Sequence, residues 1–135
     1  MTLATAHATL RADAPNYVVD LTAGAHALTG DEGPHEGGAN RGPTPFEFVL
    51  SGLAQCTAAT LRMYIQRKGW PDGTIDVDTS LHADHEGNQL IRRTVSVAAP
   101  IDAAQRARLA EICEKTPVTR FIKHSTRIET TMTGA

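Results

Sequence analysis

The longest periodic element of this sequence covers residues 44–71, TPFEFVLSGLAQCTAATLRMYIQRKGWP. At its start, Thr44 is followed by a proline and, three residues on, by Glu47, which together make a T-x-x-E capping box with proline at the first helical position. Gly69, with a second proline two residues later, is typical of a helix end. The pattern therefore predicts one long helix over residues 45–68.

The first half of this predicted helix is apolar on nearly every side. Its hydrophobic residues are Phe46, Val49, Leu50, Leu53, Ala54, Leu61 and Ile65. A polar face emerges only with Arg62, Gln66 and Arg67. In a soluble protein, a helix that is hydrophobic all round is buried between layers or between subunits, and we expect this helix to be buried in that way.

Segments on both sides of the helix alternate between apolar and polar residues, which is typical of half-buried strands. Before the helix, residues 4–11 and 17–22 predict antiparallel strands, and the run GDEGPHEGGANRGPTP at residues 30–45 predicts a loop. After it, residues 75–84 and 91–97 predict a hairpin with one buried and one wet face. The second of these alternations sets Ile91, Arg93, Val95 and Val97 against Arg92, Thr94 and Ser96.

The end of the chain completes the expected fold. Asp102 is a good N-cap for a helix that carries Cys113 and stops at Pro117, and residues 128–132 alternate as a last strand. The order of strands, long helix, hairpin, helix and strand predicts an α+β fold with an antiparallel sheet. The length suits a single domain over residues 1–135.

Composition and charge exclude several classes of protein. The net charge is −2, and neither a basic stripe nor an aromatic-flanked cluster of lysine and arginine is present, which argues against binding of nucleic acid. Residues 1–12 have no basic start followed by an apolar run, so no secretory signal is expected. No stretch approaches the roughly 20 apolar residues of a membrane span. We therefore expect a soluble, cytoplasmic protein with no membrane partner.

The candidates for chemistry are two cysteines, Cys56 in the long helix and Cys113 in the second helix. A reducing compartment keeps such thiols free, and a chain of this size folds without a disulfide. No C-x-x-C motif is present, which disfavours a thioredoxin-like site and a zinc knuckle. From the residues alone two interpretations stay open: buried packing residues or redox-active thiols.

A weaker constellation lies at the predicted hairpin tip, where His82 and His85 flank Asp84. Such side chains are metal ligands in other proteins, but no third or fourth ligand has a fitting spacing here. A solvated strand end explains the same residues. We therefore expect neither a metal nor a cofactor.

Two segments of the sequence resemble the OsmC/Ohr family. Residues 37–64, GGANRGPTPFEFVLSGLAQCTAATLRMY, match its Gly-rich loop, its G-P-[ST]-P-x-E helix start and its mid-helix cysteine. Residues 113–120, CEKTPVTR, resemble the family's second signature. The order of strands and helices agrees as well, so the resemblance covers nearly the whole chain.

This resemblance implies an OsmC-like fold, in which antiparallel sheets pack on two long central helices of an interlocked homodimer. Well-studied members are thiol peroxidases that reduce organic hydroperoxides. By resemblance, Cys56 is the peroxidatic nucleophile and Cys113 the resolving thiol. The family's oxidised cysteines are re-reduced by an external dithiol, often lipoyl-linked, and no cofactor is implied.

The resemblance also assigns residues that activate the thiol, because a thiolate in an apolar site needs a cation and a carboxylate that orients it. Glu47 matches the family's helix-start glutamate, and Arg41 is the nearest candidate for its arginine. Glu47 precedes Cys56 by nine residues, roughly 13 Å along a straight helix. Their contact therefore requires a partner subunit, a kink or a bridging arginine.

Two departures from the best-known peroxidases motivate a second hypothesis. No arginine lies between Tyr17 and Glu36, where their activating arginine occurs, and Thr116 stands where their resolving cysteine precedes the proline. Cys113 lies three residues earlier, on the same helical face. The leading prediction is a thiol-dependent organic hydroperoxide reductase of the oxidative stress response. The alternative is a non-catalytic OsmC-fold protein that binds a small hydrophobic ligand at its dimer interface.

Overall fold

The computed structural model describes residues 1–134 and has the predicted α+β fold with antiparallel sheets. The chain forms two compact units, residues 1–50 and residues 51–135. Helix α1 (Pro45–Lys68) begins in the first unit and continues in the second.

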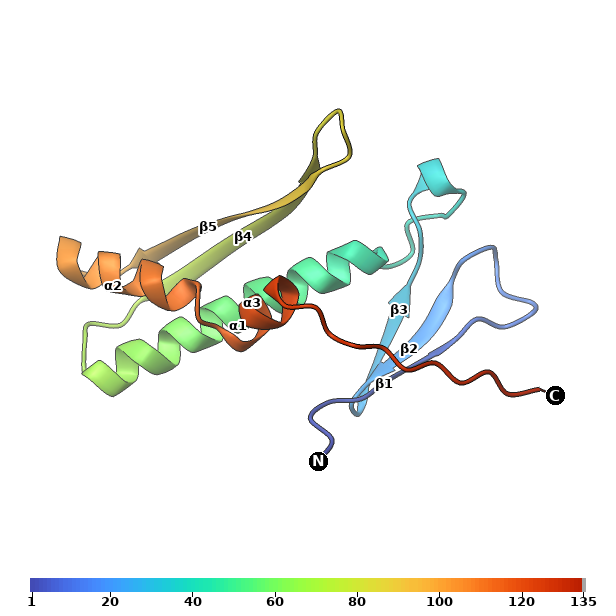
Figure 1. Ribbon diagram of the computed structural model, residues 1–135, viewed down its shortest axis with the longest axis horizontal. Helices are drawn as coiled ribbons and strands as arrows, with labels where there is room; N and C mark the ends of the chain where they lie inside the picture. The colour runs from blue at the N-terminus through green and yellow to red at the C-terminus, as the bar shows by residue number, and fades with distance from the viewer. Residues whose placement is uncertain (135) are drawn as a thin grey trace. The chain divides into compact units, whose positions relative to one another are not determined.

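The first unit contains a three-stranded sheet in the order β1-β2-β3 (Figure 1). Its strands are β1 (Ala6–Thr9), β2 (Val19–Ala23) and β3 (His26–Gly30), and both pairings are antiparallel. The strands predicted before the helix are therefore confirmed as β1 and β2. Strand β3 was not predicted, because Leu28 is its only large apolar residue and most of the strand is exposed.

The predicted loop after β3 is confirmed, apart from a short 3-10 helix at Pro34–Glu36. Asp31 is buried and organises the loop, because its carboxylate accepts hydrogen bonds from the backbone N–H groups of Glu32, Ala39 and Arg41 at 2.7, 3.1 and 3.1 Å. The glycines allow tight turns. At Gly42, for example, a Cβ atom would lie 2.1 Å from a backbone carbonyl oxygen of β3.

Helix α1 begins and ends where the sequence predicts. Glu47 Oε1 accepts from the backbone N–H of Thr44 at 2.8 Å, and Thr44 Oγ1 accepts from the N–H of Glu47 at 3.3 Å, so the capping box is formed. At the other end Gly69 has a φ of +67°, a left-handed conformation that glycine adopts without strain.

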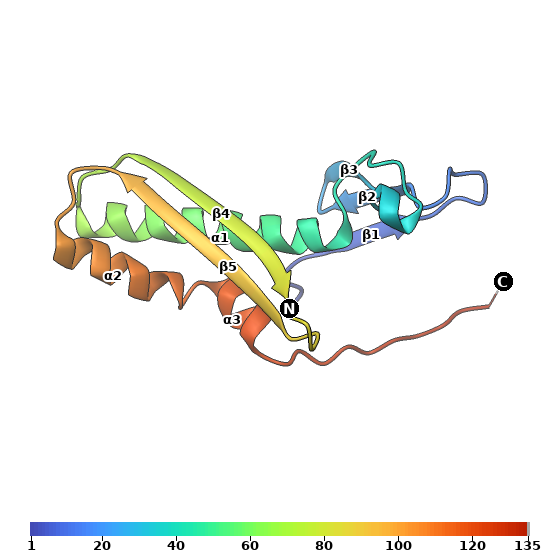
Figure 2. The ribbon, with the colours of Figure 1, turned by 90° about the horizontal axis from the view of Figure 1, so that it is seen from above.

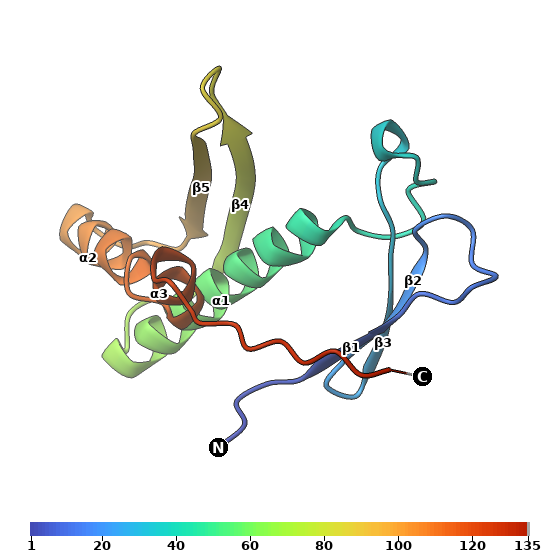
Figure 3. The same ribbon diagram turned by 45° about the vertical axis from the view of Figure 1, so that its right-hand side comes forward.

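The second unit contains the predicted hairpin, formed by β4 (Thr74–Ala83) and β5 (Gln89–Ala98). Burial alternates along both strands, which confirms one inward and one wet face. Asp84 closes the turn by accepting from the N–H groups of Glu86 and Asn88, both at 2.9 Å. In Figure 3 the hairpin stands beside α1 and α2.

Two helices follow the hairpin, α2 (Ala103–Cys113) and α3 (Pro117–Lys123). Asp102 caps α2 as predicted, accepting from the N–H of Gln105 at 2.7 Å. The prediction that this helix stops at Pro117 is wrong: α2 already ends at Cys113, and Pro117 is the first residue of α3. Thr116 is the N-cap of α3, and proline at the first helical position lacks only an N–H that the helix does not use.

The last strand predicted at residues 128–132 is wrong for the single chain. Between Ser125 and Gly134 the structure has neither helix nor strand, and the side chains of Ile128 and Met132 are 85 % and 90 % exposed. A strand exists only when a neighbouring strand takes up its backbone hydrogen bonds. No strand of the described chain pairs with this segment.

The core of the second unit lies between α1, α2 and the inward face of the hairpin (Figure 2). Its buried residues are Leu61, Ile65, Leu109, Ile112 and Cys113. Hairpin side chains such as Val95 and Val97 pack on this cluster. The core therefore holds α2, and with it Cys113, against one face of α1.

Candidate functional site

Cys56 lies in the middle of α1 as a free thiol and is half-buried. Its Sγ is 3.9 Å from Oγ1 of Thr60, one helical turn later. One turn earlier stands Gly52, where a Cβ atom would meet nothing within 4 Å. Residues four apart lie on one face of a helix, so the missing side chain at Gly52 leaves open space on the same face as Cys56, one turn earlier.

Cys113 is the last residue of α2 and also a free thiol, but it is only 7 % exposed. It belongs to the core cluster together with Leu61 and Ile65 of α1. Burial raises the pKa of the Cys113 thiol above its usual value, and the positive charge of Arg93 opposes that rise. Cys113 is therefore the more protected of the two thiols.

The guanidinium of Arg93 connects the turns that follow the two cysteines. Its Nη1 donates to Oγ1 of Thr57 at 3.0 Å and to Oγ1 of Thr119 at 2.8 Å. Its Nη2 donates to the carbonyl oxygen of Cys113 at 2.9 Å and to the carboxylate of Glu114 at 2.8 Å. Arg93 thus binds α1, the end of α2 and α3 through one side chain that is only 12 % exposed.

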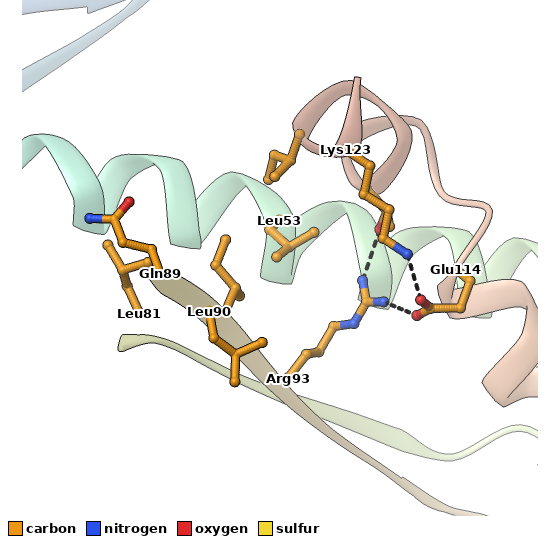
Figure 4. A pocket seen from close by; sticks show the side chains of 10 residues that line it. Leu53, Leu81, Gln89, Leu90, Arg93, Glu114 and Lys123 are labelled. Carbon is orange, nitrogen blue, oxygen red and sulfur yellow. Dashed lines mark hydrogen bonds and ion pairs between the residues drawn. The ribbon is translucent and has the colours of Figure 1, made fainter. Parts of the chain in front are cut away.

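A chain of charges runs from this guanidinium to the surface. Glu114 also accepts from Nζ of Lys123 at 2.7 Å, as Figure 4 shows. The pKa of the Glu114 carboxyl is lowered, chiefly by the hydrogen bond from Lys123 and also by the charge of Arg93. Glu114 therefore stays ionised at neutral pH and shares its charge between the two cations.

Next to this cluster lies a cavity of about 490 Å³ within the second unit (Figure 4). Aliphatic side chains make up most of its wall, and Arg93, Glu114 and Lys123 stand at one end. The lining residues are Leu53, Leu81, Gln89, Leu90, Ile91, Arg93, Glu114, Thr119, Ile122 and Lys123. A cavity with an apolar wall and one charged end suits a small amphipathic molecule.

The other two predicted site residues, Glu47 and Arg41, belong to the first unit. The carboxylate of Glu47 is taken up by the capping box, and the hydrogen bond from the N–H of Thr44 is the main reason that its pKa is lowered. Arg41 is exposed, and its backbone N–H is the chief cause of the lowered pKa of Asp31. Activation of Cys56 by these two residues stays a prediction.

Among residues 1–134 no three His, Cys, Asp or Glu side chains are arranged to hold a metal ion. His82 instead makes a hydrogen bond of 2.7 Å with Ser80 on the exposed face of β4. No helix in the described part of the chain is long and apolar enough to cross a membrane.

The role of Arg93 was not predicted, although the sequence carries a signal for it. Arg93 alternates with exposed Arg92 and Thr94 and falls on the same strand face as Val95. A charged residue on an inward strand face needs buried hydrogen-bond partners. Those partners, Thr57 and Thr119 among them, lie 20–36 residues away in sequence, beyond the reach of local patterns.

Comparisons with known proteins identify the family. The model of the family described as OsmC-like protein matches residues 37–131. No curated protein matches the sequence. Several solved structures share the fold at low sequence identity.

An OsmC-like protein from Mycoplasma pneumoniae aligns with a TM-score of 0.73 and 17 % identity over 90 % of this chain and 88 % of the other. An organic hydroperoxide resistance protein OsmC from Legionella pneumophila aligns with a TM-score of 0.65 and 18 % identity over 91 % of this chain and 90 % of the other. The organic hydroperoxide resistance protein OhrB of Bacillus subtilis aligns with a TM-score of 0.61 and 18 % identity over 90 % of this chain and 91 % of the other. With the family model matched over more than half of its length, the chain belongs to the OsmC-like protein family.

Proposed function

We propose that this protein is a cytoplasmic, homodimeric thiol peroxidase that reduces organic hydroperoxides, with residues 1–135 acting as one domain. The observation that carries the proposal is the setting of Cys56. It is a free, half-buried thiol in the middle of the family's signature helix, with open space beside it at Gly52. Names such as organic hydroperoxide resistance protein, given to structures with the same fold, support the substrate class.

In the first step the Cys56 thiolate attacks the terminal oxygen of the hydroperoxide. A sulfur–oxygen bond forms and the O–O bond breaks. The alkoxide takes a proton and leaves as an alcohol, so Cys56 becomes a sulfenic acid while the peroxide is reduced. The gap at Gly52 gives a peroxide room to approach the sulfur along the helix surface.

In the second step the sulfur of Cys113 attacks the Cys56 sulfenic acid. The sulfur–sulfur bond forms, the sulfur–oxygen bond breaks, and the oxygen leaves as water after taking the thiol proton. An external dithiol, lipoyl-linked in our proposal, then reduces this disulfide by thiol–disulfide exchange and is itself oxidised. No metal or cofactor takes part in either step.

We assign activation of Cys56 to Glu47 and Arg41 of a second copy of the chain. An exposed guanidinium next to a thiolate favours the charged form, and a carboxylate orients that guanidinium. Because Glu47 and Cys56 are nine residues apart on one helix, a second copy is the most direct source of the pair.

Large apolar side chains support the homodimer. Phe46, Val49 and Met63 of α1 are 58 %, 48 % and 61 % exposed in the single chain, although apolar surface on a helix is normally covered. A second copy is the partner that would cover them and pair with residues 128–132. Sedimentation of wild type and of Met63→Glu tests this: we expect a dimer that the charge weakens, and a monomeric wild type would contradict it.

The activity is tested by mixing reduced protein with tert-butyl hydroperoxide and dihydrolipoamide and following loss of peroxide. We expect the wild type to consume many equivalents, whereas Cys56→Ser consumes none above the rate of the reductant alone. Cys113→Ser, the matched control, should still consume one equivalent of hydroperoxide per Cys56. Equal turnover by wild type and Cys56→Ser would contradict the proposal.

A second candidate function is binding of a small hydrophobic ligand without catalysis, and the cavity lined by Leu53 and Leu90 favours it. If the protein has this function, we expect wild type and Cys56→Ser to bind the apolar probe 1-anilinonaphthalene-8-sulfonate equally well. The same probe should be displaced when Leu53→Trp fills the cavity. Binding together with no peroxide turnover would favour this candidate over the peroxidase.

A further inference from the structure

The part-buried side chain of Arg93, 12 % exposed, lies on the inward face of β5 between two β-branched apolar residues of the same face. Its two Nη nitrogens carry four N–H groups. Four acceptors surround them, at 2.8–3.0 Å, from Thr57, Thr119, Cys113 and Glu114. Each Nη nitrogen of Arg93 therefore donates two hydrogen bonds.

The partners of Arg93 come from the segments that carry the two thiols. Thr57 follows Cys56 in α1, and its Oγ1 also donates to the carbonyl of Leu53 at 2.7 Å. The carbonyl of Cys113 receives a second hydrogen bond from Oγ1 of Thr119 at 3.1 Å. One guanidinium thus fixes the backbone at the end of α2 to the α1 turn beside Cys56.

Packing alone does not account for an arginine at this position. Moving a charge out of water is costly, and well-packed apolar residues often replace a buried ion pair without loss of stability. Val95 and Val97 occupy the neighbouring inward positions of β5 in that way. Among residues 1–134, the only carboxylate bound to Arg93 is that of Glu114, which is 58 % exposed and is shared with Lys123.

We propose that Arg93 is a positioning residue for the second thiol: it holds Cys113 against the α1 turn that follows Cys56, so that the Cys113 sulfur meets the Cys56 sulfenic acid. The inference rests on the proposed function, because it assigns a residue to the second step of that reaction. Arg93 acts through the Cys113 carbonyl and through its charge, and it takes no part in the first step.

Two physical effects make this role useful. A reacting group misplaced by about 1 Å loses roughly a hundredfold in rate, so a rigid attachment of the Cys113 backbone favours condensation. The positive charge of Arg93 also favours the thiolate form that attacks the sulfenic sulfur, against the opposing burial. The charged groups that act on the Cys113 thiol are Arg93 from β5, which favours the thiolate, and the adjacent Glu114, which opposes it and is paired with Lys123 of α3. Tyr64 of α1 packs on the same core cluster as Cys113.

The test compares Arg93→Met and Arg93→Lys with Arg92→Met, a matched control on the exposed face of the same strand. Each reduced protein is mixed with one equivalent of tert-butyl hydroperoxide, and mass spectra over time separate the Cys56 sulfenic acid from the Cys56–Cys113 disulfide. We expect sulfenic acid formation to change less than about twofold in every variant. Disulfide formation should slow at least about tenfold in Arg93→Met and less in Arg93→Lys, which keeps the charge.

A second readout follows Cys113 without any peroxide chemistry. In the Cys56→Ser background, the rate of alkylation of Cys113 by iodoacetamide is measured against pH. Loss of the guanidinium should move this profile to higher pH in Arg93→Met, with Arg93→Lys closer to wild type and Arg92→Met unchanged. A purely structural role would leave the midpoint of the profile in place or expose the thiol and move the profile downward.

The outcomes separate the two proposals. Sulfenic acid that forms and condenses at the wild-type rate in folded Arg93→Met overturns the positioning role and leaves the peroxidase intact. Absence of any Cys56 oxidation overturns the peroxidase, while the alkylation profile still decides whether Arg93 acts on Cys113. If Arg93→Met does not fold, Thr57→Val removes the contact to α1 alone, and an unchanged condensation rate in that variant overturns the inference.

Discussion

Replacing Thr57 by valine removes one buried hydroxyl from α1 and keeps the branched shape of the side chain. Thr57 is fully buried, its Oγ1 donates to the Leu53 carbonyl at 2.7 Å, and it accepts from Nη1 of Arg93 at 3.0 Å. The Leu53 carbonyl keeps its place in the helix, so the main loss falls on Arg93. One of its part-buried N–H groups is left without an acceptor.

The size of the effect follows from these contacts. An unsatisfied buried donor costs about 1–3 kcal/mol, and the extra buried methyl group of valine returns up to about 1 kcal/mol. We therefore expect Thr57→Val to lower the free energy of unfolding by about 1–2 kcal/mol. For a chain of this length the corresponding fall in Tm is about 4–8 °C.

Thermal and urea unfolding at one fixed protein concentration measure this change, since association makes the apparent stability depend on concentration. The control is Thr60→Val, the same substitution three residues along α1, where the only contact of the hydroxyl within residues 1–134 is the 3.9 Å one with the Cys56 sulfur. A loss of less than about 0.5 kcal/mol in Thr57→Val, or a loss equal to that of the control, would refute the reasoning about the Arg93 contacts.

Three further changes test the capping box, the charge cluster and the core. Thr44→Ala removes the hydroxyl that caps α1 and should lower the free energy of unfolding in urea by about 1 kcal/mol; an unchanged urea midpoint would argue against the cap. Glu114 has a pKa below its usual 4.5, so its contribution to stability is present above pH 4.5 and is lost as the pH falls through the folded-state value. Glu114→Gln should therefore melt below wild type at pH 7, with the difference in Tm shrinking as the pH falls below 4.5, and a constant difference would contradict this. Leu61→Ala opens a cavity at a fully buried position and should cost about 2–5 kcal/mol in urea unfolding, whereas a cost below that range would place Leu61 outside the core.

Features that depend on neighbours in sequence were predicted well. Helix α1 begins at the capping box of Thr44 and Glu47 and ends at the glycine at position 69. Both ends could be predicted because helix caps use contacts within one turn. The alternation in β4 and β5 likewise shows which face is buried. Pro117 was misread as a stop, since a proline ends one helix and begins another with the same local signal.

Features that depend on distant partners could not be predicted. The alternating residues 128–132 have the pattern of a strand, but pairing decides whether a strand forms. Arg93 was placed on the inward face by its alternation, while its bond to the Cys113 carbonyl joins residues 20 apart. Local patterns located both cysteines on their helices and did not reveal that one is half-buried and the other lies in the core.

The claim that Cys56 is the peroxidatic thiol is tested most directly by the mass of the reduced protein after one equivalent of tert-butyl hydroperoxide. We expect the wild type to lose about 2 Da as a disulfide that peptide mapping assigns to Cys56 and Cys113. In Cys113→Ser, a gain of about 16 Da should map to Cys56. An unmodified Cys56 in both proteins would contradict the account.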